Sequence, residues 1–357
     1  MRYVDLGAVN ALNEKRKEKK KVRVRIILPL IFGFLMLFGA AFLFAVRSKG
    51  VAALLNPVSL VTNLVSSTPL TSADGRVNVV LFGVDRRIAD SSPGLTDTIL
   101  VLSVGKFSKD LVMISMPRDL WVKAPSGSFS KINAVYALSG REDAVKVVSD
   151  VLGIPIHYYA VVDFRLFEKI IDILGGIEID VEHAFDDYDY PIEGMENAYP
   201  EALRYLHVRF EQGFQKMDAK TALIYSRSRK GTNGEGTDFA RAKRQQKVIN
   251  AVWKKVLSLE VLANPVKMKD LYDSYRDSVE TNVGFVEGQK FYELIRSVNL
   301  SKNRSVVLDD RSNIDSGGLL YKPEDSTLYG GAYVLIPKTG DYSQIHGYIQ
   351  KLLFSDN

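Results

Sequence analysis

Cysteine is absent from this chain of 357 residues and histidine is scarce, and these two shortages exclude several kinds of site. Without cysteine there is no disulfide framework, no thiolate-bound zinc or iron–sulfur cluster and no thiol nucleophile. The four histidines are scattered and form neither an HExxH motif nor an obvious zinc triad. With 46% hydrophobic residues, the chain is suited to one large globular domain or two ordinary ones.

The body of the chain lacks any excess of positive charge, although the net charge of the whole is +5. Residues 1–25 hold nine Lys or Arg and three Asp or Glu, whereas the rest holds 38 basic and 39 acidic side chains. The basic tail could serve as a nucleic-acid arm, but its position directly before an apolar run favours a role in membrane topology. We therefore expect no nucleic-acid partner.

Residues 26–46 form an uninterrupted apolar run without a charged side chain. At about 1.5 Å per residue, 21 residues span roughly the 30 Å hydrocarbon core of a bilayer. Eight of the 11 residues from 15 to 25 are Lys or Arg, which predicts a cytoplasmic N-terminus and an extracytoplasmic remainder. A cleavable signal peptide is the alternative, but its apolar region is only ~7–15 residues long. We expect a single-pass protein of the cell membrane with an uncleaved signal-anchor.

After the tail (1–25) and the anchor (26–46), we expect a linker over 47–76 and a catalytic core over 77–257. Residues 258–357 are expected to add helices and a late strand, at 333–336, to the same domain. Apolar, β-branched runs predict buried strands, and helical spacing of apolar residues predicts helices between them. The strands are predicted at 77–84, 98–104, 111–116, 157–163 and 177–181, and the helices at 142–152, 164–174, 216–225 and 239–257. This alternation predicts a layered α/β fold.

The acidic segment 182–201 also contains proline and glycine, and we interpret it as a solvated surface loop. A calcium site is the alternative for this segment. No EF-hand spacing supports it.

Three polar residues lie where the first three predicted strands meet loops, which is where α/β sheets usually bind ligands. Asp85 ends the first strand, Asp97 precedes the second and Arg118 follows the third. Two carboxylates near strand ends can hold one Mg²⁺, which prefers oxygen ligands and keeps waters for a substrate phosphate. Two acids 12 residues apart are weak evidence on their own.

Arginine is concentrated in the second half of the core. Arg227 and Arg229 are two residues apart and would point the same way in an extended chain. Arg241, Arg244 and Gln245 would share one face of a helix. Arginine binds phosphate in a bidentate manner and stays charged when desolvated, although a solvated basic surface would have the same composition.

Seven segments resemble, in order, blocks of the LytR–CpsA–Psr family of cell-envelope enzymes, from about residue 77 to 256. The segments read VNVVLFGVDRR, GLTDTILVLSV, LVMISMPRDLWV, KINAVYALSG, YYAVVDFRLFEKIIDILGGIEIDV, GFQKMDAKTALIYSRSR and DFARAKRQQKVINAV. The resemblance implies a three-layer α/β/α domain with a central mixed sheet outside the membrane, and a cavity for a polyprenyl chain. It also implies transfer of a glycopolymer from a polyprenyl-pyrophosphate carrier to peptidoglycan.

The resemblance assigns roles residue by residue. Asp85 and Asp97 match carboxylates that bind Mg²⁺, for which Mn²⁺ could substitute, and one of the two aspartates would serve as the base. The side chains that match pyrophosphate ligands are those of Arg118, Lys131, Arg227, Arg229, Arg241 and Gln245.

One position departs from the family pattern. The family usually has arginine where this chain has Leu95, and Arg87 is a plausible substitute. There are two alternatives to the transferase. One is a polyprenyl-pyrophosphate pyrophosphatase, in which water replaces the sugar acceptor, and the other is a non-catalytic lipid-binding or regulatory envelope protein. Leu95 favours the second of these, whereas the retained aspartates and arginines favour an enzyme.

Overall fold

A computed structural model describes most of the chain beyond residue 68. The described residues are 69–84, 94–262, 264, 266–267, 270–271, 273–274, 279–311 and 317–355. The predicted anchor, Asp85 and Arg87 lie outside them. Among the described residues, no helix combines the length and the apolar character needed to cross a membrane.

The chain divides into two compact units. The larger comprises Leu70–Pro191 and Arg209–Asn357, and the described part of the smaller is essentially residues 192–208. Within the smaller unit, Arg204 Nε donates a hydrogen bond to the carbonyl oxygen of Ala198 at 2.9 Å, and the Tyr199–Pro200 peptide bond is cis. The smaller unit also contains the 3₁₀ turn Glu201–Arg204 and the first residues of β9 (Tyr205–Phe210); all other elements described below belong to the larger unit.

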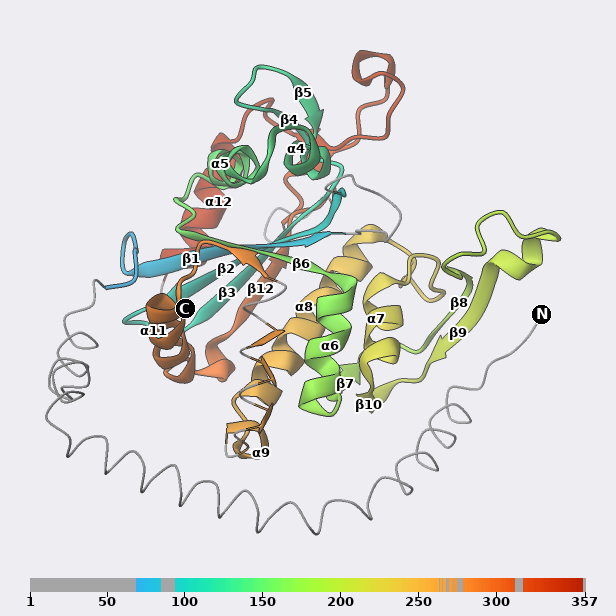
Figure 1. The fold of residues 1–357 in the computed structure, drawn as a ribbon. Coiled ribbons are helices and arrows are strands. Elements are labelled where there is room, and N and C mark those ends of the chain that lie inside the picture. Colours follow the sequence, from blue (N-terminus) through green and yellow to red (C-terminus); the bar gives the residue numbers. More distant parts are fainter. Residues whose placement is uncertain are drawn as a thin grey trace, which may run out of the picture. The chain divides into compact units, whose positions relative to one another are not determined.

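A six-stranded mixed sheet is the centre of the larger unit (Figure 1), with the strand order β11-β6-β1-β2-β3-β12. Its strands are β1 (Arg76–Val84), β2 (Thr96–Gly105), β3 (Leu111–Met116), β6 (Tyr158–Asp163), β11 (Glu280–Thr281) and β12 (Arg304–Val307). The β1–β2–β3 meander is antiparallel, whereas β6 runs parallel to β1 and β12 parallel to β3. The two edge strands, β11 and β12, therefore come from the last quarter of the chain.

Helices cover both faces of this sheet, because alternate residues of its strands point to opposite sides. Val80 and Phe82 belong to the core cluster shared with α4 (Ile132–Ser139), α5 (Arg141–Leu152) and α12 (Ser343–Phe354). Leu81 and Leu100 pack on the other side with residues of α8 (Asp238–Val256) and α11 (Phe285–Arg296). Figure 1 shows α6 (Phe164–Leu174) and α7 (Ala219–Arg227) beside α8 on this second side. The expected layered α/β architecture with a central mixed sheet is confirmed.

Short elements complete the fold. They are β4 (Trp121–Lys123), β5 (Phe129–Lys131), β7 (Ile177–Val181), β8 (Phe185–Pro191), β9 (Tyr205–Phe210), β10 (Gly213–Met217), β13 (Leu320–Tyr321), β14 (Ile336–Pro337), α9 (Leu259–Leu262) and the 3₁₀ turns Glu201–Arg204, Leu300–Lys302 and Thr327–Tyr329. Three antiparallel pairs join β4 to β5, β7 to β10 and β13 to β14.

Most predicted elements occur within a residue or two of their expected bounds, but three predictions are wrong. The segment 182–201 is not all loop, because β8 begins at Phe185 and buries Phe185, Asp187 and Tyr190. The helix expected from 216 begins only at Ala219, because β10 continues to Met217 and Asp218 caps the helix, accepting a hydrogen bond from the Thr221 N–H at 2.8 Å. The strand expected at 333–336 is reduced to β14.

One edge of the sheet gathers the ends of several strands. The carboxyl ends of the parallel strands β1 and β6 meet there, with the amino end of β2 between β1 and the carboxyl end of β3. The β1–β2 register shifts between Gly83 and Val84, so that Val84 pairs with Thr96. Asp97 is therefore the second residue of β2 rather than the residue before it. This edge positions the site described next.

Candidate active site

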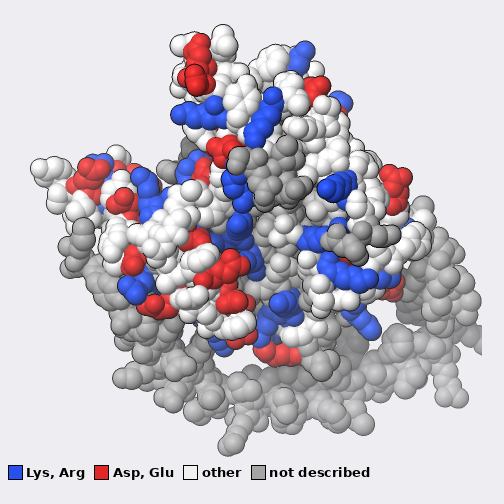
Figure 2. All heavy atoms as spheres, turned by 180° about the vertical axis from the view of Figure 1, so that it is seen from behind, with Lys and Arg blue, Asp and Glu red and all other residues white. Residues whose placement is uncertain are grey.

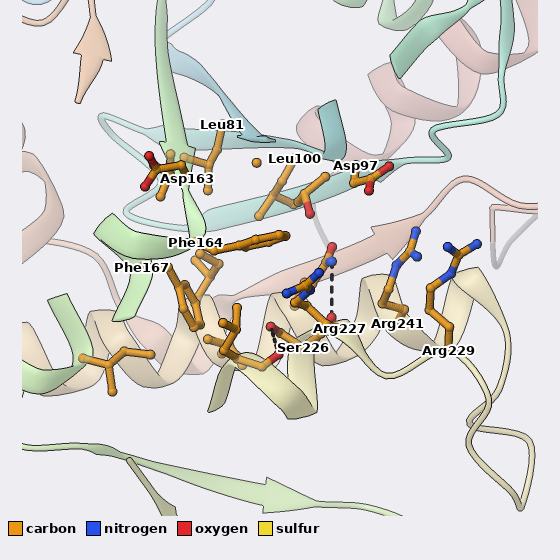
Figure 3. A pocket seen from close by; sticks show the side chains of 18 of the residues that line it. Leu81, Asp97, Leu100, Asp163, Phe164, Phe167, Ser226, Arg227, Arg229 and Arg241 are labelled. Atoms are coloured by element: carbon orange, nitrogen blue, oxygen red, sulfur yellow. Dashed lines mark hydrogen bonds between the residues drawn. The ribbon is translucent and has the colours of Figure 1, made fainter. Parts of the chain in front are cut away.

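A cavity of about 530 Å³ lies between the second face of the sheet and helices α6, α7 and α8. Figure 3 shows Phe164 and Phe167 on one side of it and Arg227, Arg241 and Arg229 following one another further along, with Asp97 across from the arginines. The apolar lining consists of Leu81, Leu100, Val162, Phe164, Phe167, Ile170, Ile171, Leu223, Val248, Ile249 and Val252. The charged and amide side chains are those of Asp97, Asp163, Asp187, Asp189, Arg227, Arg229, Lys230, Arg241 and Gln245.

The apolar part arises from helical spacing on two facing helices. Phe164, Phe167 and Ile171 are three to four residues apart on α6, and Val248 and Val252 are four apart on α8. Asp163 starts α6, because its carboxylate accepts a hydrogen bond from the Leu166 N–H at 2.8 Å. The volume lies within the range of about 300–1,000 Å³ that is typical of small-ligand sites. These walls suit an apolar chain.

Arg227 lies where the apolar and charged parts meet. It is the last residue of α7, and its guanidinium carbon lies 4.1 Å from the centre of the Phe164 ring. The expectation that Arg227 and Arg229 belong to an extended chain is therefore wrong, because the first of them is helical. Both nevertheless line the same cavity, since the chain turns at Ser228.

A buried carboxylate holds this turn. Asp187 on β8 is 1% exposed, and its Oδ2 accepts hydrogen bonds from the Ser228 hydroxyl at 2.5 Å and from the N–H groups of Arg229 and Lys230, both at 3.1 Å. Charge-assisted hydrogen bonds of this kind are stronger than neutral ones. Asp187 therefore fixes the backbone from which two cationic side chains reach the cavity. The sequence analysis missed it because it treated the segment as loop.

Two carboxylates and three arginines form an ion-pair network at the charged end of the cavity, and three of them, Asp97, Arg229 and Arg241, line the cavity itself. Arg118 Nη1 lies 2.9 Å from Asp97 Oδ1, and Arg118 Nε lies 3.6 Å from Asp238 Oδ2. Asp238 Oδ1 lies 3.0 Å from Arg241 Nη1 and 3.3 Å from Arg229 Nε. Asp238, at the start of α8, therefore contacts all three arginines, although it was not among the site residues predicted from the sequence.

Burial and mutual repulsion affect these cations differently. Burial is the main reason that the pKa of Arg241 is lowered to about 10; Asp238 opposes this effect, whereas repulsion from Arg118 and Arg229 adds to it. For Arg118 the effect of burial is outweighed by Asp97 and Asp238, which raise its pKa above the usual value. Both guanidiniums are charged at neutral pH. Three guanidiniums meet at this end, and because arginine binds anionic groups in a bidentate manner, the site is suited to an anion.

Comparison with known proteins decides the family. The sequence matches the LytR_cpsA_psr family over residues 51–346. The chain belongs to the LytR–CpsA–Psr family. It is 28% identical over 319 residues to TagU of Bacillus licheniformis, named a polyisoprenyl-teichoic acid–peptidoglycan teichoic acid transferase, with 88% of this chain and 95% of TagU covered.

Of two further relatives, one has the same transferase name and the other is named a regulatory protein. TagV of Bacillus subtilis, with the same transferase name, is 27% identical over 255 residues, which cover 71% of this chain and 59% of TagV. MsrR of Staphylococcus aureus, named a regulatory protein, is 31% identical over 212 residues, which cover 59% of this chain and 57% of MsrR. The crystal structure of TagV has the same fold, with a TM-score of 0.58 at 24% identity over 80% of this chain and all of that structure.

Not every residue that the family resemblance suggested lies in the cavity. Gln245 lines it, and its Nε2 donates a weak hydrogen bond of 3.4 Å to the Ser226 carbonyl oxygen. Arg118 and Lys131 are absent from the described lining residues of the cavity, although Arg118 contacts Asp97, which lines it. Lys131 contacts Asp119 instead. Its Nζ lies 2.7 Å from Asp119 Oδ1, and the other oxygen of Asp119 lies 3.5 Å from Arg118 Nε. Lys131 is thus separated from the charged end by one carboxylate.

Arg244 shows the limit of reasoning from helical periodicity. It was expected on the same face as Arg241 and Gln245, but it is buried and does not line the cavity. Its Nη1 lies 2.5 Å from Glu235 Oε2, and its Nε donates to the Tyr225 carbonyl oxygen at 2.9 Å. Arg244 therefore holds the α7–α8 connection together.

The metal expectation rests on Asp85 and Asp97, of which only Asp97 is described. The described residues contain no group of three or more His, Asp or Glu side chains that could hold a metal ion. Asp97 itself lines the cavity and its side chain is 34% exposed, which suits a ligand that supplies one oxygen while water and substrate supply others. Asp97 therefore fits Mg²⁺ as one oxygen ligand.

Proposed function

We propose that this family member is a membrane-anchored phosphotransferase that moves a glycopolymer from a polyprenyl-pyrophosphate carrier to peptidoglycan. The observation that carries the proposal is a single cavity with an apolar wall of α6 and α8 residues and an arginine cluster at its end. A polyprenyl pyrophosphate has the same two parts in the same order. The names of TagU and TagV as polyisoprenyl-linked teichoic acid transferases support the reaction class.

The residues at the charged end have separable roles in this reaction. Arg229 and Arg241 would neutralise the pyrophosphate, and Arg227, stacked on Phe164, would mark the point where the lipid ends and the phosphate begins. The acceptor hydroxyl attacks the phosphorus that carries the glycan. The bond from this phosphorus to the bridging oxygen breaks, and the electron pair leaves on the lipid phosphate. Preorganised cations stabilise this charge because they need no reorganisation.

The hydroxyl proton needs an acceptor at the same end. Asp97 is the described carboxylate that faces the cavity and contacts Arg118, so we assign it the base or a metal-ligand role beside Asp85. Bound Mg²⁺ would supply Lewis-acid stabilisation of the phosphate oxygens. We include Mg²⁺, with Mn²⁺ as a substitute, in the proposal on the basis of this carboxylate and of its match to the family's metal ligands.

Membrane attachment and an extracytoplasmic location are part of the same proposal. They rest on the apolar run 26–46 and on the Lys and Arg that precede it. A reporter that is active only outside the cytoplasm should be active when fused after residue 357 and inactive when fused near residue 10. The reverse pattern would contradict both the topology and a peptidoglycan acceptor.

The ligand class is tested by what the full-length protein retains on purification from bacterial cells. We expect mass spectrometry to find a polyprenyl phosphate or pyrophosphate bound to the wild type. Phe167→Asp, which places a charge in the apolar wall, should lose it. The matched control Phe107→Asp, at a side chain that is 84% exposed, should retain it. Equal retention by both variants, or no polyprenyl species in the wild type, would contradict the proposal.

A non-catalytic binding or regulatory role is the second candidate. Leu95 favours it, because this 48% exposed leucine stands where the family usually has arginine, and MsrR carries a regulatory name. If the chain is an enzyme, Leu95→Arg should raise the rate of glycopolymer transfer. A wild type that retains lipid but turns over no donor would support the regulatory role, and release of phosphate with water as the acceptor would support a pyrophosphatase.

A further inference from the structure

A second cavity, of about 450 Å³, lies against the opposite side of α8 from the cavity described above. Its lining comes from α8, β12, α12 and the segments around Glu182 and Arg311, and consists of Glu182, Lys243, Gln246, Lys247, Asn250, Ser305, Val306, Val307, Arg311 and Tyr348. Figure 2, which views the molecule from behind, shows lysine and arginine side chains gathered near the middle of that face with acidic side chains beside them.

Helix α8 separates the two cavities, because its residues divide by helical position. Successive residues of an α-helix are rotated by about 100°. The α8 residues in the first cavity, from Arg241 to Val252, therefore share one face, and Lys243, Lys247 and Asn250 lie on the opposite face. Gln246, which is 4% exposed, joins this second face to the sheet, because its amide donates hydrogen bonds of 2.9 Å to Ser115 Oγ and to the Val306 carbonyl oxygen.

The chemistry of the second cavity differs from that of the first. Its wall carries three cations, one carboxylate, two amides and the hydroxyls of Ser305 and Tyr348, and its apolar side chains are those of Val306 and Val307. Lys247 Nζ lies 2.8 Å from Glu182 Oε1, and the resulting hydrogen bond is the main reason that the pKa of Glu182 is lowered. Arg311 pairs with the buried Asp309. One positive charge remains in excess, so the cavity suits a ligand that is rich in hydroxyls and carries an acidic group.

A narrow cavity of about 20 Å³ lies between the two. It shares Asp97, Arg241 and Gln245 with the first cavity and Val307 with the second. The narrow cavity therefore adjoins both the charged end of the first cavity and the wall of the second. In phosphoryl transfer the attacking oxygen approaches roughly in line with the leaving oxygen, from the opposite side. With the lipid phosphate leaving toward the apolar wall, the acceptor enters from the side of the second cavity.

We propose that the cavity between α8 and β12 binds a sugar of the peptidoglycan acceptor together with a carboxylate of the peptide attached to it. This inference rests on the proposed transferase function and adds to it the place where the acceptor glycan is held. Lys243 and Arg311 receive the acidic group, and the amide and hydroxyls of Asn250, Ser305 and Tyr348 receive the sugar hydroxyls.

Steady-state kinetics of the full chain test this assignment, with a polyprenyl-pyrophosphate-linked sugar as donor and a soluble disaccharide-peptide fragment of peptidoglycan as acceptor. Lys243→Glu should raise the KM for the acceptor about three- to tenfold and leave the KM for the donor unchanged, because a partly exposed ion pair is replaced by a repulsion. Lys254→Glu is the matched control: it lies on the same face of α8, 11 residues and about 16 Å further along, outside the cavity lining. A change in the donor KM instead would assign the cavity to the donor glycan and overturn the proposal.

Direct binding separates this inference from the proposed function. The peptidoglycan fragment should bind the wild type and Lys254→Glu equally in a calorimetric titration, and should bind Lys243→Glu and Lys243→Ala more weakly; chitobiose, which lacks the carboxylate, should bind weakly to all four. If donor turnover fails in the wild type but this binding pattern holds, the transferase proposal fails and the glycan site stands. If transfer is normal and the Lys243 variants bind the fragment like the wild type, the glycan site is wrong and the transferase proposal stands.

Discussion

Two clusters of arginine and aspartate lie at different ends of the central sheet, and they differ in how deeply their side chains are buried. At the end remote from the cavity, Arg76 donates from Nε to Ser103 Oγ at 2.8 Å, from Nη1 to Asp110 Oδ1 at 3.0 Å and from Nη2 to the Ser103 carbonyl oxygen at 2.9 Å. Both side chains of this ion pair are about 5% exposed. The guanidinium is thus satisfied on every side within the protein.

The cluster at the cavity is more exposed than the remote one. Arg118, Arg229 and Arg241 share Asp97 and Asp238, whose side chains are about one-third exposed. Burial would raise the pKa of Asp110, but hydrogen bonds from Arg76 and Ser108 outweigh it and lower that pKa, whereas the pKa of Arg241 falls to about 10. The buried pair of Arg76 and Asp110 is part of the folded core. The more exposed cluster that faces a cavity can exchange its internal ion pairs for contacts with an incoming ligand.

The largest effect on stability is expected from Asp110→Ala. This change leaves the Arg76 guanidinium buried without a carboxylate, which costs about 3–5 kcal/mol of unfolding free energy. Denaturant unfolding measures the loss, with Asp172→Ala, at an exposed position of α6, as the control. A loss below about 1 kcal/mol would remove the distinction between the two clusters.

Arg241→Met should behave in the opposite way. The substitution removes a desolvated cation that is repelled by Arg118 and Arg229, so the midpoint of unfolding should stay the same or rise. Donor turnover should fall, because a charge-assisted contact to phosphate is worth roughly 1.5–3 kcal/mol, or about 10- to 150-fold in kcat/KM. A variant that loses stability while keeping kcat/KM would assign Arg241 to the core instead.

Asp187→Asn should have a smaller, mixed effect. The amide keeps one acceptor oxygen but loses the charge that holds the Ser228 hydroxyl and the N–H groups of Arg229 and Lys230. We expect the lost hydrogen-bond energy, roughly 1–3 kcal/mol, to show partly as a lower free energy of unfolding and partly as a higher KM for the donor. Asp187→Glu, which restores the charge, should recover part of the KM. No recovery would mean that the carboxylate does not position the turn.

The smallest effect concerns pH and the remote cluster. Asn78 N–H donates to His157 Nδ1 at 3.0 Å, and burial lowers the pKa of His157 below its usual 6.5. The unfolded chain therefore binds the proton more readily, so stability is complete above about pH 6.5 and falls as the pH drops toward the folded-state pKa. Between pH 7.5 and 5, the free energy of unfolding should decline less in His157→Gln than in the wild type. The same dependence on pH in both proteins would contradict this role of His157.

Much of the fold followed from local patterns in the sequence. The apolar runs of β1, β2, β3 and β6 and the helical spacing of α6 and α8 specified these elements, and Asp97 and Arg118 were visible as polar residues at strand ends. Pairings between distant segments were not predictable in this way. β12 completes the sheet beside β3 although about 190 residues separate them, and its short run carries no signal of its partner.

The site was only partly predictable for a related reason. Arg241 and Arg244 are three residues apart on α8, yet one faces the cavity and the other binds Glu235 and the end of α7. Which cation is available depends on what packs against α8, and that is decided by tertiary structure. Asp187 escaped notice because its burial depends on β8, whose acidic sequence suggests solvent.

The contacts of Asp238 with three arginines have a consequence for the ionic-strength dependence of binding. In the absence of an anionic ligand, this carboxylate and Asp97 act as internal counter-ions, so Arg118, Arg229 and Arg241 do not need to recruit anions from solution. A pyrophosphate then exchanges places with protein carboxylates, and fewer dissolved ions are released than the number of arginines would indicate. The affinity for the donor should accordingly be less sensitive to salt than that of an open basic surface with the same number of cations.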